Sequence, residues 1–94
     1  MTDAHEERER VRGRIADAVV AFVNLMEHYA GARFRMSDLV AFVTMRVGGA
    51  VAPESPGRIL RLLAAENRVR YRVVNRRQSL YEARLVPQQG SLAL

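Results

Sequence analysis

The spacing of apolar residues changes at Asn67, and this change constrains the fold more than any other feature of the sequence. Before Asn67, apolar residues recur every three or four positions, which is the period of a helix that buries one face. After it, apolar residues alternate with arginines through residues 68–73, which is the period of a half-buried strand. The sequence therefore predicts mainly helices before this point and a pair of strands after it.

Three helices and one short strand are expected in the first part of the chain. The first helix runs from about residue 3 or 4 to about residue 29 or 30, and Gly31 ends it. Its first turns, residues 1–10, are mostly charged and are expected to be a helical extension stabilised by pairs of opposite charge. Residues 32–36, ARFRM, alternate apolar with charged side chains and predict a short strand.

Serines mark the expected starts of the next two helices. Ser37 is the predicted N-cap of the second helix, which ends at the glycine pair 48–49. Ser55 is the predicted N-cap of the third, with Pro56 in the first helical position and Asn67 as a left-handed residue beyond its end. The side chains of the third helix expected to face the core are Ile59, Leu62 and Leu63. Those expected on its exposed face are Gly57, Arg58, Arg61, Ala64 and Ala65.

The last two strands are expected to form an antiparallel hairpin. Their two alternations agree if the numbers of paired residues add up to 154. This register predicts four pairs, Val73 with Tyr81, Tyr71 with Ala83, Arg72 with Glu82 and Val74 with Leu80. The hairpin tip is predicted at residues 75–79. Residues 87–94 show no period and are expected to be a flexible tail.

The expected order is helix, strand, helix, helix, strand, strand, in one mostly helical α+β domain that spans residues 1–94. This order resembles the winged helix-turn-helix family over about residues 15–86. Here FRMSDLVAFV is similar to the family's strand and second helix, SPGRILRLL to its recognition helix, and YRVVNRRQSLYEA to its wing. The connection of about seven residues before Ser55 is longer than the turn of a compact helix-turn-helix. The resemblance implies a third helix in the major groove of DNA and a wing on the backbone or minor groove.

Arginine supplies all fifteen basic residues, and their distribution is uneven. Residues 1–47 hold seven arginines and seven acids, whereas residues 48–94 hold eight arginines and three acids. The whole net charge of +5 therefore lies in the second half, and the partner-facing surface is expected there. A planar guanidinium group suits both phosphates and base edges, so the expected partner is double-stranded DNA.

Two segments carry the predicted contacts with DNA. On the third helix, the guanidinium groups of Arg58 and Arg61 match O6 and N7 of guanine, and Ala65 could pack near a thymine methyl group. In the hairpin, alternation displays arginines to solvent, and those at the tip reach farthest toward phosphates or a narrow minor groove. The candidate DNA-binding residues are Ser55, Gly57, Arg58, Arg61, Ala65, Arg68, Arg70, Arg72, Arg76, Arg77 and Gln78.

Three alternatives stay open at this point. The arginines could be a solvated face that keeps the protein in solution and blunts edge pairing. The same basic surface could instead bind an acidic protein of a transcription or replication complex, as a winged-helix adaptor. The first helix has a wide apolar face, and Val20 and Val23 on it could serve either a homodimer or the core of one chain. The preferred interpretation is a small DNA-binding protein that regulates transcription.

Other classes of function find little support in the sequence. Neither histidine has a companion at the spacing of metal ligands, and no serine lies in a G-x-S-x-G turn. The lack of lysine excludes a Walker motif and a Schiff base, so no enzyme activity, cofactor or metal is expected. No apolar run approaches the ~18 residues that cross a membrane, and an apolar leader is lacking. We expect a cytoplasmic protein without a membrane partner, associated with the nucleoid if its source is bacterial.

Overall fold

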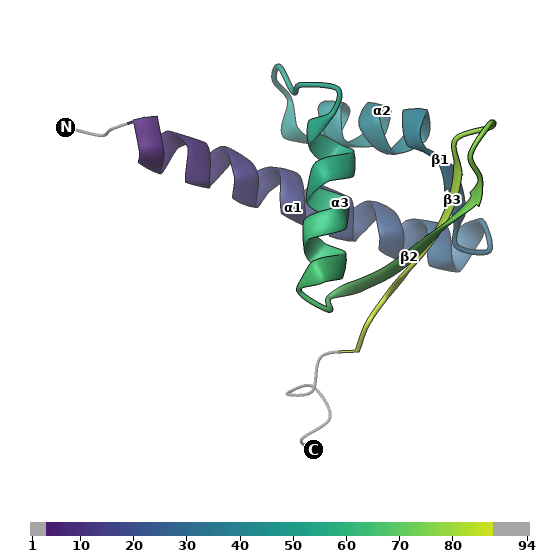
Figure 1. Cartoon of the computed structure of the whole chain (residues 1–94). Coiled ribbons are helices and arrows are strands. Elements are labelled where there is room, and N and C mark those ends of the chain that lie inside the picture. The colour runs from purple at the N-terminus through teal and green to yellow at the C-terminus, as the bar shows by residue number, and fades with distance from the viewer. Residues whose placement is uncertain (1–3, 88–94) are drawn as a thin grey trace.

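The helices and strands follow one another in the expected order (Figure 1). The computed structural model describes residues 4–87, which form α1 (Ala4–Tyr29), β1 (Arg33–Arg35), α2 (Met36–Val47), α3 (Ser55–Ala65), β2 (Val69–Asn75) and β3 (Leu80–Leu85). The fold is α+β, with a small antiparallel sheet whose strand order is β1, β3, β2. The tail predicted at residues 87–94 lies outside the described residues from residue 88 onward, so that prediction stays untested.

Helix α1 has a protruding first part and a second part that enters the core. The side chains from Glu6 to Arg14 are exposed, and burial begins at Ile15. In Figure 1 the first part extends away from the other elements. Charged side chains suit this position because burying a charge without a partner is costly. Of the charged extension predicted at residues 1–10, the described part is helical from Ala4, and the exposed stretch continues to Arg14.

The wide apolar face of α1 serves the core of its own chain. Val23 is fully buried, and Val20 is partly buried and packed against the core. The side chain of Val23 is therefore not available to a second molecule in this structure, whereas the homodimer prediction at the partly buried Val20 stays untested. The extra apolar width has a physical cause, because α1 packs against α2, α3 and β3 at once.

Phe22 joins three elements at the centre of the core. The centroid of its ring lies 5.1 Å from that of Phe34 in β1 and 5.3 Å from that of Phe42 in α2. Edge-on and tilted ring pairs of this kind add to the stabilisation that burial provides. The three-residue strand β1 is therefore anchored to α1 through its one buried side chain, Phe34.

The hairpin register is confirmed along most of its length. Residues 69–73 pair with residues 81–85 as expected, including Arg72 with Glu82. The prediction fails at the end nearest the tip, where Asn75 and not Val74 pairs with Leu80. A bulge leaves Val74 as an extra residue, and a bulge of this kind bends and twists the strand. The turn that follows spans residues 76–79, and its last residue, Ser79, has a φ of 53°.

Both predicted serine N-caps are wrong. Helix α2 begins at Met36, and its N-cap is Arg35, whose backbone N–H donates a 3.2 Å hydrogen bond to Oδ2 of Asp38. Because this carboxylate caps the free backbone group, the helix starts two residues earlier than a cap at Ser37 would allow. Helix α3 begins at Ser55 itself. The left-handed conformations expected beyond the ends of α2 and α3 are both present, at Gly48 (φ 75°) and Asn67 (φ 62°).

Helix α3 is rotated relative to the prediction. Ile59 and Leu63 face the core as expected, but the third core residue is Leu60, which is fully buried, and not Leu62, which is 40% exposed. Gly57 is also buried, against Met36 of α2. The pair at 59 and 63 is compatible with either leucine, so the periodicity alone left the rotation undetermined.

Candidate nucleic-acid interface

The exposed face of α3 carries a short patch that we call the helix surface, formed by Arg58, Arg61, Leu62 and Ala65. Residues at this spacing lie next to one another on one side of a helix. Within residues 4–87 neither arginine forms a salt bridge, so both guanidinium groups keep their donors for a partner. Leu62 adds an apolar side chain one turn beyond Arg58 on the same side of the helix. In Figure 1 the helix stands in front of the other elements, and none of them covers it.

Gly57 does not belong to the helix surface, although the sequence suggested it as a contact. A Cβ atom built at this position would lie 3.4 Å from Sδ and 3.5 Å from Cε of Met36. At this position α3 and α2 leave room for a Cβ atom in van der Waals contact with Met36. Ser55, the first residue of α3, is partly buried, so its side chain is less available to a partner than that of a fully exposed serine.

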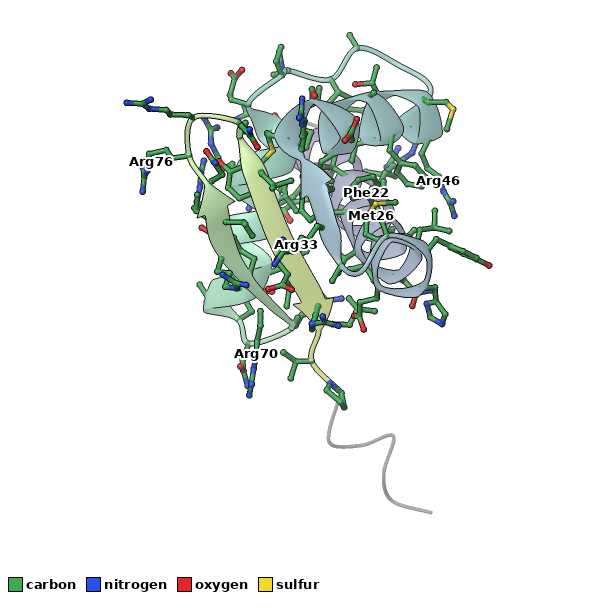
Figure 2. The ribbon with its side chains drawn as sticks, turned by 90° about the vertical axis from the view of Figure 1, so that its right-hand side faces the viewer. Phe22, Met26, Arg33, Arg46, Arg70 and Arg76 are labelled. Atoms are coloured by element: carbon green, nitrogen blue, oxygen red, sulfur yellow. The ribbon has the colours of Figure 1, made fainter. Side chains whose placement is uncertain are left out.

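The hairpin tip, residues 76–79, displays Arg76, Arg77 and Gln78 to solvent. Two hydrogen bonds hold the turn, one of 3.1 Å from the Gln78 backbone N–H to the side-chain oxygen of Asn75 and one of 3.2 Å from the Ser79 N–H to the Arg76 carbonyl. Figure 2 shows Arg76 projecting from the tip, away from the body of the fold. The tip therefore presents its two arginines on an ordered turn.

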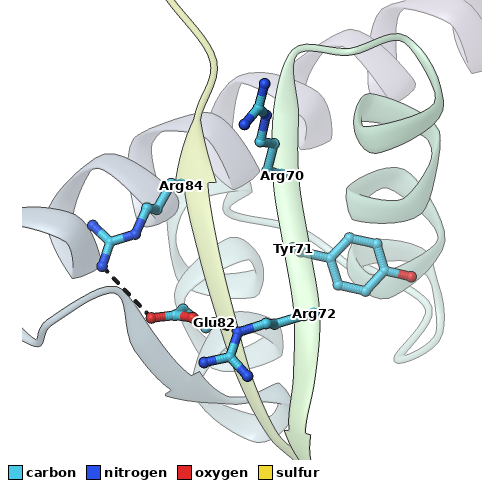
Figure 3. Close-up of a pocket in the computed structure, with 5 residues that line it drawn as sticks. All are labelled: Arg70, Tyr71, Arg72, Glu82 and Arg84. Atoms are coloured by element: carbon cyan, nitrogen blue, oxygen red, sulfur yellow. Dashed lines mark hydrogen bonds and ion pairs between the residues drawn. The ribbon is translucent and has the colours of Figure 1, made fainter.

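Arg70 and Arg72 are exposed, as expected, but they lie on the face of the sheet that points away from α3 (Figure 3). Along β2 they alternate with Val69 and Tyr71, which pack into the core, so the two arginines point to the opposite face of the sheet. Figure 3 shows this division, with Tyr71 directed toward α3 and Arg72 directed toward Glu82. The two arginines are therefore not continuous with the helix surface. Arg68 is exposed in the loop between α3 and β2.

The outer face of the sheet faces a different side of the molecule from α3. Helix α3 stands in front in Figure 1, whereas the outer face of the sheet, with Arg33 on it, turns toward the viewer only in Figure 2. A straight partner that lies along α3 cannot cover both. The predicted set of DNA-binding residues is thus divided between two surfaces, α3 and the outer face of the sheet. The hairpin tip lies at the end of the sheet.

No family model, curated protein or solved structure matches this chain. The interpretation of the site rests on the geometry of the chain itself.

Glu82 is the acid at the centre of the outer face of the sheet. Its Oε1 accepts a 2.7 Å hydrogen bond from Nε of Arg72, and its Oε2 lies 3.5 Å from a terminal nitrogen of Arg84. The hydrogen bond from Arg72, with the nearby charges of Arg84 and Arg33, lowers the pKa of Glu82 below its ordinary value of 4.5. The carboxylate therefore stays charged and holds two arginines in place.

An open groove of about 310 Å³ separates the protruding part of α1 from the start of α3. Arg8 and Arg12 of α1 line it together with Arg58 of α3, and the lining also includes the apolar side chains of Val11 and Ile59. The groove brings two further cations close to one end of the helix surface. The sequence did not indicate this neighbourhood, because residues 8 and 58 are distant in the chain.

Two functional candidates were missed at the sequence level, because Leu62 was assigned to the core and Arg84 was not considered as a contact. Arg33 and Arg35 were weaker candidates in the sequence and were left out of the predicted set. The alternation within β1 and β3 is visible in the sequence, but the pairing of Arg33 with Glu82 joins residues far apart in the chain.

Within residues 4–87, no group of three or more potential metal-ligating side chains is present, and no helix has the length and apolarity to cross a membrane.

Proposed function

We propose that this protein binds double-stranded DNA as a winged-helix domain and that it regulates transcription. The observation that carries the proposal is the helix surface, where Arg58 and Arg61 form no salt bridge within residues 4–87 and lie beside Leu62 on a helix that no described element covers. In the proposed complex α3 lies in the major groove. The hairpin tip, which is the wing, contacts the adjacent backbone or minor groove.

The chemistry of the helix surface fits the base edges of the major groove. Each guanidinium group of Arg58 and Arg61 can donate two hydrogen bonds to O6 and N7 of guanine. Leu62 and Ala65 offer apolar contact to thymine methyl groups. An 11-residue helix is about 16 Å long, which suits a site of a few base pairs.

The hairpin tip supplies contacts that do not depend on sequence. Arg76 and Arg77 are exposed and form no salt bridge within residues 4–87, so their charge is available to phosphates. If Arg58, Arg61, Arg68 and the two tip arginines neutralise about five phosphates, the logarithm of affinity should fall with the logarithm of salt at a slope of about −4 to −5.

The test is selection of bound duplexes from a random pool, followed by affinity measurements on the enriched sequence. Arg61→Ala should weaken binding to that sequence about tenfold and affect random duplexes less, because a lost base contact costs roughly 1–3 kcal/mol. The matched control is Arg46→Ala, which removes one exposed arginine from α2 and should leave affinity within about twofold. Equal losses in both variants would reject the assignment of α3. No retention of any duplex at low salt would reject DNA binding and favour the acidic-protein adaptor.

A further inference from the structure

The outer face of the sheet is a second basic surface, independent of α3. Alternation and the pairings of β1 with β3 and of β2 with β3 bring five exposed arginines to this face. One acid, Glu82, accompanies them. We call this set the outer sheet surface, and its charged members are Arg33, Arg35, Arg70, Arg72, Glu82 and Arg84.

The arginines of the outer sheet surface have defined cross-strand positions around Glu82. Arg33 and Arg72 are the direct cross-strand neighbours of Glu82 on its two sides, and Arg70 pairs with Arg84. Glu82 engages one edge of the Arg72 guanidinium group at 2.7 Å and one terminal nitrogen of Arg84 at 3.5 Å. Their remaining N–H groups are left for a partner, next to a shallow hollow of about 140 Å³.

Five guanidinium groups against one carboxylate make this surface complementary to a phosphate backbone. Single-stranded nucleic acid fits less well, because it needs aromatic rings on which bases can stack. The nearest candidates, Tyr71 and Tyr81, alternate with the arginines and pack against the core on the inner face. A shallow, cationic, open surface instead suits the outside of a duplex, where contacts to phosphate carry no sequence information.

We propose that the outer sheet surface binds the backbone of a second DNA duplex while α3 holds the first. The two surfaces face different sides of the molecule (Figures 1 and 2), so a duplex in contact with α3 leaves the sheet free. One protein molecule then joins two duplexes. This inference rests on the proposed function for the first duplex, and the second contact is independent of base sequence and sensitive to salt.

The test is a bridging assay with two short duplexes of unrelated sequence. One carries the enriched sequence and is fixed to beads, and the other is fluorescent and free. The wild-type protein should recover the free duplex. Arg33→Gln together with Arg84→Gln should reduce this recovery about tenfold, because the second contact consists of phosphate contacts alone, and should leave affinity for the fixed duplex within about twofold. If this variant fails to fold, Arg70→Gln with Arg84→Gln replaces it, since all three side chains are exposed.

The outcomes separate the two proposals. A wild-type protein that binds the fixed duplex and recovers no second one overturns this inference and leaves the proposed function intact. Recovery that the sheet variants do not reduce also overturns it, because the bridge would then form elsewhere, for example between paired protein molecules. The protein could instead capture poly-glutamate and not the free duplex, and lose this capture in the sheet variants. That result would assign the surface to an acidic protein and overturn the inference. A protein that binds neither duplex contradicts the proposed function itself.

Discussion

Arg72 and Glu82 face each other across the β2 and β3 ladder, with 2.7 Å between the Nε atom of one and the Oε1 atom of the other. The carboxylate also lies near Arg84, so one acid organises two cations on the outer sheet surface. The side chain of Glu82 is only 18% exposed, so it lies against the sheet, beneath the more exposed arginines.

This pair predicts a pH-dependent contribution to stability. The folded-state pKa of Glu82 is lowered, chiefly by the hydrogen bond from Arg72, so the ion pair stabilises the fold above the ordinary pKa of 4.5. That stabilisation is lost as the pH falls through the lowered folded-state value. Glu82→Gln should therefore be less stable than wild type near pH 7, and the difference should shrink near about pH 3. Urea denaturation at both pH values measures this.

The control for Glu82 is Glu66→Gln, since the Glu66 carboxylate forms no salt bridge in the described part of the chain. It should change stability little at either pH. A Glu82→Gln protein that loses the same stability at both pH values would show that packing, and not the ion pair, explains the loss.

Leu60 and Leu62 form a matched pair on α3, two positions apart and on opposite faces. Leu60→Ala should cost about 2–5 kcal/mol of unfolding free energy, because the side chain is fully buried. Leu62→Ala should cost less, about 1–2 kcal/mol, since Leu62 is 40% exposed and only the rest of its side chain is buried. Chemical denaturation distinguishes them.

The same pair separates stability from binding. Covering the exposed part of Leu62 against DNA is worth roughly 0.6–1.2 kcal/mol, so Leu62→Ala should weaken binding to the enriched duplex about threefold to eightfold. Unchanged affinity in a folded Leu62→Ala protein would remove this residue from the interface and place α3 differently on the duplex.

Glu27 of α1 acts as a replacement for a missing strand partner. On the β1 side of β3, the Ala83 N–H donates to the Ala32 carbonyl, and the next such group, the Leu85 N–H, donates to Oε1 of Glu27 at 2.5 Å. Glu27→Ala should lower the unfolding free energy by about 1.5–3 kcal/mol. It should also speed hydrogen exchange at the Leu85 amide. Glu27→Gln keeps an acceptor, so its loss of unfolding free energy and its increase in exchange rate should both be smaller. Full protection of that amide in Glu27→Ala would contradict this role.

Gly57 offers a prediction of the opposite sign. Its added Cβ atom would make only van der Waals contact with Met36, and alanine favours helix over glycine, so Gly57→Ala should stabilise the fold by about 0.5–1 kcal/mol. Gly57→Leu should destabilise it by about 1–3 kcal/mol, because the larger side chain cannot fit between α3 and α2. Thermal unfolding of the two variants side by side checks the order. Destabilisation by alanine would mean that this contact is tighter than described.

Local signals in the sequence were sufficient for the helices, the strands and most of the hairpin register. The alternations in β2 and β3 agree in the register whose paired numbers add up to 154, and this register predicted the pair of Val73 and Tyr81. The bulge at Val74 was not predicted, because an extra residue on one strand leaves no mark in the alternation of the sequence.

Two features depended on packing that the sequence does not display. The rotation of α3 was ambiguous, since Ile59 and Leu63 could be joined in the core by either neighbouring leucine. The outer sheet surface depends on β1, three residues long, pairing with a strand that starts 45 positions after β1 ends. The position of Arg33 beside Glu82 therefore became visible only with the fold.

The most direct test of the account is an NMR titration of the isotope-labelled protein with the enriched duplex. With the first equivalent of DNA, the account predicts that the largest amide shifts fall on Arg58, Arg61, Leu62 and Ala65 and on residues 76–78. Shifts that leave α3 unchanged and gather instead on α2 around Arg46 would contradict it.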